Sequence, residues 1–283
     1  MVSLRQRIRK GRIAIRRRCV AFLRKHLPKW GLTVVSHASR GQMISTIGLV
    51  RPFNTEHSLI RFGSAHDGGY LVPDDLDGIV ACFSPGVSTS VDFELDMARR
   101  GIPSFMIDAS IDALPQAHPM FTFQALWLGP EDNEARHTIS LSTWLARHAK
   151  ETGAGDLILQ MDIEDAEWAV LHSTPDSTLQ RFRIIVLELH DLTSLASRKG
   201  NLYIREVFEK LHRHFVVVHA HPNNVRRPES INGVKIHPLL EITLLRRDRV
   251  TRSEPATSFP HTLDARNVTG RPDVRLAPIW IDR

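Results

Sequence analysis

The chain has 283 residues, of which 42% are hydrophobic and 24% charged, as in an ordinary globular protein with one principal domain. Its net charge of +6 comes from the N-terminal part, because no Asp or Glu precedes Glu56 and acids outnumber Lys and Arg after it. A mildly acidic body argues against a nucleic acid partner. The two cysteines lack metal-type spacing, and neither a membrane-spanning run nor a secretory signal is visible, so we expect a cytoplasmic protein.

The first thirty residues have the pattern of a basic amphipathic helix. Apolar or small residues recur in steps of three and four from Leu4 to His26, between stretches rich in arginine. Such a helix can make a peripheral contact with an anionic membrane surface. An extension that packs lightly on the domain, a transit peptide and a nucleic-acid-binding arm fit the same residues. Residues 1–55 are therefore interpreted as an N-terminal extension and connector.

Short apolar runs alternate with helical patterns from residue 56 to residue 250. This order predicts an α/β domain with a Rossmann-like, mostly parallel sheet, helices on both faces and one antiparallel edge strand. The stretch RFGSAHDGGYLVPDDLDG indicates tight turns before the sheet, and residues 251–283 read as a surface strap. The expected strands are residues 78–84, 103–108, 120–128, 156–162, 183–188, 215–220 and 239–245. The expected helices are residues 91–100, 141–150, 166–172 and 203–214.

A glycine turn after the first core strand and an acid after the second predict a nucleotide-type cofactor site. In open α/β sheets, ligands bind beyond the carboxyl ends of the strands. The segment FSPGVSTSVDFE contains Gly86, which permits close backbone approach, and Asp108 is placed to hold two ribose hydroxyls. Because the full G-x-G-x-x-G pattern is missing, an adenosyl group with a sulfonium is favoured over a dinucleotide.

Ionisable residues also follow the next two core strands. The segment LILQMDIEDAEWAVL places Asp162 and Glu164 at a strand end, and IIVLELH places Glu188 and His190 at the same edge. Such a cluster can position an acceptor hydroxyl and take its proton, or bind a divalent cation through Asp162 and Glu188. Helix capping by the acids and a structural role for the histidine are the alternatives.

The HPNN turn supplies a third group of polar side chains. His221, Asn223 and Asn224 follow a later strand, and adjacent amides can bind sugar hydroxyls. Turn formation explains the same residues equally well.

Taken together, RFGSAHDGGYLV, the glycine turn running into VDFELDMARRG, MDIEDAEWAVL, LELH and HPNN with PLLEITLLRRD resemble the FkbM-type methyltransferases. The resemblance covers residues 61–247 and implies a seven-stranded class I methyltransferase fold with S-adenosylmethionine as methyl donor. It also implies an oxygen acceptor on a carbohydrate or a polyketide-type metabolite. Two positions depart from the family, since Pro85 and Asp165 stand where it has glycine or another small residue.

The resemblance assigns roles by position. Gly86 would lie under the methionine end of the cofactor, Asp108 would bind the ribose, and Asp162 would lie beside the transferring methyl. Asp67, Gly68 and Gly69 match an entry segment that closes over the site. The expected catalytic residues are Asp162, Glu188 and His190. The expected cofactor-binding residues are Phe83, Gly86, Val87, Asp108 and Asp162. The expected acceptor-binding residues are Asp67, Tyr70, Glu164, His221, Asn223 and Asn224.

The sequence therefore predicts an S-adenosylmethionine-dependent methyltransferase that modifies a hydroxyl on a carbohydrate, glycolipid or secondary metabolite. A divalent metal is compatible with the acids but is not required by them. Three alternatives remain: a nicotinamide-linked oxidoreductase, a membrane-docked binding protein whose cofactor site has decayed at Pro85 and Asp165, and an RNA methyltransferase guided by the basic N-terminus. The oligomeric state is not indicated.

Overall fold

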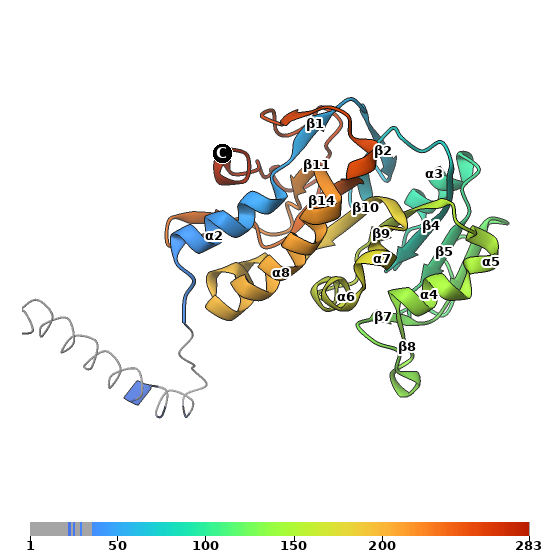
Figure 1. Cartoon of the computed structure of the whole chain (residues 1–283), viewed down its shortest axis with the longest axis horizontal. Helices are drawn as coiled ribbons and strands as arrows, with labels where there is room; N and C mark the ends of the chain where they lie inside the picture. Colours follow the sequence, from blue (N-terminus) through green and yellow to red (C-terminus); the bar gives the residue numbers. More distant parts are fainter. Residues whose placement is uncertain (1–21, 24, 26–28, 30–35, 283) are drawn as a thin grey trace, which may run out of the picture.

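The computed structural model describes Phe22, Leu23, Lys25, Lys29 and residues 36–282 (Figure 1). The predicted N-terminal amphipathic helix lies almost entirely outside these residues. No helix in the described part of the chain combines the length and apolar character needed to cross a bilayer.

Within residues 36–282 the centre of the molecule is a seven-stranded, mostly parallel sheet, which confirms the predicted α/β class. Its strands are, in spatial order, β11 (Phe215–Pro222), β14 (Leu240–Arg246), β10 (Phe182–Leu189), β9 (Asp156–Met161), β4 (Ile79–Pro85), β5 (Ser104–Ile107) and β6 (Phe121–Gln124). One antiparallel strand is present, as predicted, but it does not lie at the edge of the sheet. β14 is antiparallel to both β10 and β11 and is inserted between them, while β11 forms the edge.

Each face of the sheet is covered by a different layer. Alternate strand residues such as Phe83 and Leu187 pack with helices on one face, and their neighbours such as Cys82 and Val186 pack on the other. The helices are α2 (Arg40–Ile47), α3 (Asp92–Arg99), α4 (Leu141–Arg147), α5 (Ala149–Thr152), α6 (Glu167–Ser173), α7 (Asp176–Leu179) and α8 (Arg198–His214). The core of the first face includes residues of α2, α4, α6 and α8, whereas α3 covers the second face together with a β-hairpin.

That hairpin replaces the turns predicted for residues 61–78. It joins β2 (Leu59–Gly63) to β3 (Gly69–Pro73) in antiparallel register. The stretch expected to be one strand at 120–128 is also divided, since β6 ends at Gln124 and β7 (Trp127–Gly129) pairs with β8 (Thr138–Ser140) outside the central sheet.

Residues 36–55 and 251–282 pack on the domain formed by residues 56–250. β1 (Phe53–Thr55) pairs with β15 (Ser253–Pro255), and α2 packs on α8, as the two helices at the left of Figure 1 show. The small hairpin of β12 (Glu229–Ile231) and β13 (Val234–Ile236) also touches α2. Short 3-10 helices complete the fold: η2 (Gly48–Val50), η3 (Glu134–Arg136), η4 (Leu192–Ala196), η5 (Arg247–Arg249) and η6 (Pro278–Trp280).

Candidate functional site

A groove opens at the carboxyl ends of β4 and β9, where the strand order reverses direction. Two adjoining cavities of about 450 and 230 Å³ share Gly86, Ser88, Asp162 and Glu164 in their walls. Reversal points of this type are where open α/β sheets bind ligands. The groove therefore lies where the sequence predicted a site.

Gly86 marks the closest approach of the two strand ends. Its φ is +88°, and a Cβ atom built on it would lie 1.6 Å from the carbonyl oxygen of Asp162. Asp162 in turn donates its backbone N–H to the carbonyl of Pro85 at 3.4 Å. Only glycine satisfies both the backbone angle and the contact, so the β4 turn and the β9 end form one rigid floor.

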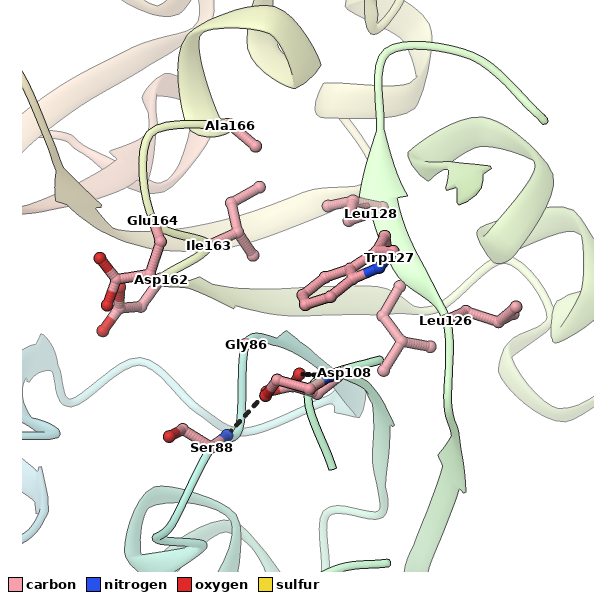
Figure 2. A pocket seen from close by; sticks show the side chains of 12 residues that line it. Gly86, Ser88, Asp108, Leu126, Trp127, Leu128, Asp162, Ile163, Glu164 and Ala166 are labelled. Carbon is pink, nitrogen blue, oxygen red and sulfur yellow. Dashed lines mark hydrogen bonds between the residues drawn. The ribbon is translucent and has the colours of Figure 1, made fainter. Parts of the chain in front are cut away.

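The larger cavity combines an apolar wall with one buried carboxylate. In Figure 2 the side chains of Trp127 and Ile163 face the space above Asp108, and Leu126 also lines the cavity. Asp108 accepts hydrogen bonds from the backbone N–H of Ser88 at 2.8 Å and of Ser110 at 2.7 Å, which fixes its carboxylate at the cavity edge. A carboxylate has acceptor sites beyond these two bonds, so it can still receive a pair of hydroxyls.

The smaller cavity is strongly acidic. Glu94 lies in its wall, is 3% exposed, and hydrogen-bonds with Ser84, whose Oγ also lies 2.6 Å from Gln160 Oε1. Burial raises the pKa of Glu94 to about 7. Other carboxylates in the two walls come from Asp67, Asp92, Asp108, Asp162 and Glu164. None of the described residues lining either cavity is Lys, Arg or His. The groove is therefore suited to a cation.

The loop after β9 has an unusual backbone. Glu164 and Asp165 both have positive φ, at +52° and +76°. A residue other than glycine costs roughly 1–2 kcal/mol in this region, although Asp tolerates it better than most. Asp165 therefore holds the left-handed conformation that glycine adopts most easily.

Four ionisable side chains form a row across neighbouring strands next to the groove. Glu188 of β10 pairs in register with Glu241 of β14, and Glu241 pairs with His221 of β11. On the other side, Met161 pairs with Leu187, so Asp162 lies beside Glu188. The side chains alternate between faces, which directs these four toward the face covered by the hairpin. We call them the ionisable row.

Two carboxyl groups of the row, those of Asp162 and Glu188, have raised pKa values. Burial raises the pKa of Asp162 to about 6, although Glu188 and His190 oppose the rise. Burial also raises the pKa of Glu188 well above its usual range, and the neighbouring charge of Asp162 adds to the shift. The Oδ1 atom of Asp162 has no hydrogen-bond partner among the described residues. Asp162 is thus a poised acid–base group that also lines both cavities.

His190 is fixed behind Asp162 by the start of α6. Its Nδ1 lies 3.2 Å from Oε1 of the fully buried Glu167, and its carbonyl accepts the indole N–H of Trp168 at 2.7 Å. Nε2 faces Asp162 at 4.0 Å and Glu164 at 3.4 Å. Burial alone would lower the pKa of His190, but the hydrogen bond and charge of Glu167 raise it above its ordinary value.

Amide side chains connect the row to distant parts of the chain. Asn223 donates to Glu188 at 2.7 Å and to Asp67 at 3.4 Å. Asn267 donates to Glu241 at 2.5 Å and to the same oxygen of Asp67 at 3.1 Å. The hairpin and the C-terminal segment therefore meet above the sheet through Asp67.

The residues that could hold a metal ion belong to the same cluster. Asp162, Glu188 and His190 each offer a ligand atom, and these atoms lie within 4.8 Å of one another. Two carboxylates and an imidazole form a donor set used by several divalent cations. The contact between Nδ1 of His190 and Glu167 leaves Nε2 available as a ligand.

The predicted site residues fall into three groups. The groove walls contain Gly86, Val87, Asp108, Asp162, Asp67, Tyr70 and Glu164. Glu188, Asn223 and His221 form a buried layer behind Asp162, and the partly buried His190 lies next to Asp162. Two residues lie elsewhere. Phe83 is fully buried and its ring packs 4.9 Å from that of Trp144, so it belongs to the core, and Asn224 binds the C-terminal segment at Val268.

Sequence reasoning missed several members of the cluster. Glu94, Glu167 and Asn267 gave no local signal that distinguishes them from surface residues. Glu241 did give one, because an acid inside the apolar run PLLEITLL has the same pattern as Asp162 and Glu188.

Trp127, Leu126 and Ile107 belong to the apolar part of the larger cavity and were also missed. The contribution of Trp127 and Leu126 depends on the break after β6, which the sequence did not predict.

No protein-family model matches the chain, and a search of curated proteins finds no match to it either.

Proposed function

We propose that the protein is an S-adenosylmethionine-dependent methyltransferase that acts on a hydroxyl group of a carbohydrate, glycolipid or secondary metabolite. The observation that carries the proposal is an acidic groove at the reversal point of the sheet, with no basic side chain among its described lining residues. A sulfonium and an ammonium are stabilised in such surroundings, whereas the diphosphate of a nicotinamide cofactor is repelled. This charge pattern favours the methyltransferase over the oxidoreductase.

The residues that line the groove support the same assignment. The apolar wall of Leu126, Trp127 and Ile163 suits an adenine ring, and Asp108 suits the ribose hydroxyls. The smaller cavity, with Glu94 in its wall, suits the charged methionine end. The seven-stranded sheet agrees with the fold that the FkbM-type resemblance implies.

Asp162 is the group that we assign to the acceptor. S-adenosylmethionine, when bound, supplies a methyl group already activated by a positive sulfur. The protein has to align an acceptor oxygen with that methyl group and remove one proton. The carboxylate of Asp162 is the proton acceptor in this proposal, and a pKa of about 6 leaves Asp162 mostly ionised at neutral pH. Glu188 and His190 are positioning residues that set this pKa.

A divalent cation at Asp162, Glu188 and His190 would perform the same task differently, by lowering the pKa of the acceptor hydroxyl. The two versions are separable by titration of the purified protein with Mn²⁺, followed by electron paramagnetic resonance. Loss of the free Mn²⁺ signal in the wild type but not in Glu188→Gln would favour the metal version.

The test of the proposed function is calorimetric titration with S-adenosylhomocysteine and, in parallel, NADH. We expect micromolar binding of the former and none of the latter. Asp108→Asn should weaken binding at least tenfold, because the carboxylate loses acceptor capacity for hydroxyls. Asp112→Asn is the matched control, since this exposed acid lies outside the lining of both cavities. Binding of NADH alone by folded protein would refute the proposal.

A further inference from the structure

A second pocket lies away from the groove and has the opposite charge. Its volume is about 630 Å³, and it is lined by Asn224, Val225, Arg227 and Pro228, by Lys235 of β13, and by residues 271–275. We call it the basic pocket. Its charged lining residues are Arg227, Lys235, Arg271, Arg275 and Asp273.

The basic pocket has a fixed frame. Asn224 is 3% exposed and donates to the carbonyls of Val268 at 3.0 Å and Arg271 at 3.3 Å. Its Oδ1 accepts the N–H of Val268 at 2.8 Å. Arg271 returns a hydrogen bond to the carbonyl of Val225 at 2.6 Å. The turn after β11 and the C-terminal segment are thereby held at a constant separation.

The positive charge of the basic pocket is not balanced from within. Asp273 faces buried His221, whose Nε2 lies 3.3 Å from its Oδ1. Burial opposes protonation of His221, but Glu241 and the nearby acids raise its pKa to about 9, so it is a cation at neutral pH. Asp273 is thus paired with a buried cation. No hydrogen bond or ion pair within the described residues engages the side chains of Arg227, Lys235 or Arg275.

We propose that the basic pocket binds the phosphate group of a ligand. Guanidinium groups recognise phosphate oxygens in a forked geometry, and the four cationic side chains that line the pocket match a group that carries up to two negative charges. The volume exceeds that of phosphate, which leaves room for the organic part of the ligand. This site is distinct from the proposed methyl-donor groove, because the two share no lining residue. The phosphate belongs either to a soluble metabolite or to a lipid headgroup.

The experiment uses the full chain and two probes. Pyrophosphate is titrated calorimetrically at low salt, and sedimentation is measured with vesicles of phosphatidylcholine alone or mixed with phosphatidic acid. Arg275→Gln should weaken binding of the recognised probe about tenfold, the effect of one lost charged hydrogen bond. Arg226→Gln is the matched control, because it removes the same charge from an exposed neighbour outside the pocket. Thermal melting verifies that both variants are folded.

The results with the two probes distinguish a soluble phosphate compound from a lipid headgroup. Binding of pyrophosphate that depends on Arg275 assigns the pocket to a soluble phosphate compound. Binding of phosphatidic acid vesicles that depends on Arg275 assigns it to a headgroup. Equal weakening by Arg226→Gln, or no binding of either probe, overturns the proposal. Titration of S-adenosylhomocysteine on the same samples shows whether the proposed function stands or falls separately.

Discussion

Replacing Gly86 with alanine tests whether the meeting of β4 and β9 forms the floor of the groove. An alanine at a φ of +88° costs roughly 1–2 kcal/mol from backbone strain alone. Its Cβ would also lie 1.6 Å from the carbonyl oxygen of Asp162, where backbone rather than a flexible side chain must move. Overpacking of this kind adds about 1–3 kcal/mol. We expect the total destabilisation to be about 2–5 kcal/mol.

Gly101→Ala is the matched control for this substitution. Gly101 has a φ of +74°, and no atom lies within 4 Å of a Cβ built on it, so only the backbone strain remains. Measured by thermal melting, Gly86→Ala should lower Tm by roughly 5–15 °C, and Gly101→Ala by a few degrees only. S-adenosylhomocysteine binding should be lost in the first variant and retained in the second. Equal decreases in Tm with intact binding would refute the close-approach argument.

Three further predictions concern charge. His190→Gln should move the titration midpoint of Asp162 above about 6, because the histidine charge lowers the pKa of that carboxyl; carbon NMR of Asp-labelled protein measures it, and an unchanged midpoint would contradict the assignment. Replacing buried Arg183, which binds Asp156 at 2.9 Å, with leucine should cost about 3–5 kcal/mol in urea unfolding, whereas a loss below about 1 kcal/mol would show that the pair is not structural. The pKa of His221 is raised to about 9 in the folded protein, so its protonated form stabilises the fold, fully below the unfolded pKa of about 6.5. This contribution to the free energy of unfolding, on the order of 3 kcal/mol, should be lost in the wild type as pH rises through 9. In His221→Gln the contribution should be missing at every pH.

Strands with strong local patterns were predicted, and elements that depend on distant partners were not. The apolar runs of β4, β9 and β10 are long enough to identify alone, and an acid at the end of a run identified Asp162 and Glu188. The position of β14 between β10 and β11 depends on pairing with strands that are distant in the sequence. The local pattern of Leu240–Arg246 predicts a strand but not its neighbours.

Two missed elements differ in how far the sequence could have revealed them. The β2–β3 hairpin has short strands around a Gly-rich turn, so its residues resemble a loop until they pair. The helix α2 had a usable signal, because Ser39 and Gln42 form a capping box that a search for S-x-x-Q would have found. Its weak amphipathic pattern concealed it.

The contact of Asp67 with Asn267 has a consequence for how the protein is made. The two residues are 200 positions apart, so the polar layer over Glu188 and Glu241 cannot close until residue 267 has left the ribosome. At about 5–20 residues per second, Asp67 waits roughly 10–40 s before this partner is synthesised. Glu188 and Glu241 stay hydrated until Asn267 arrives, so water is excluded from this polar layer only after that residue has been added.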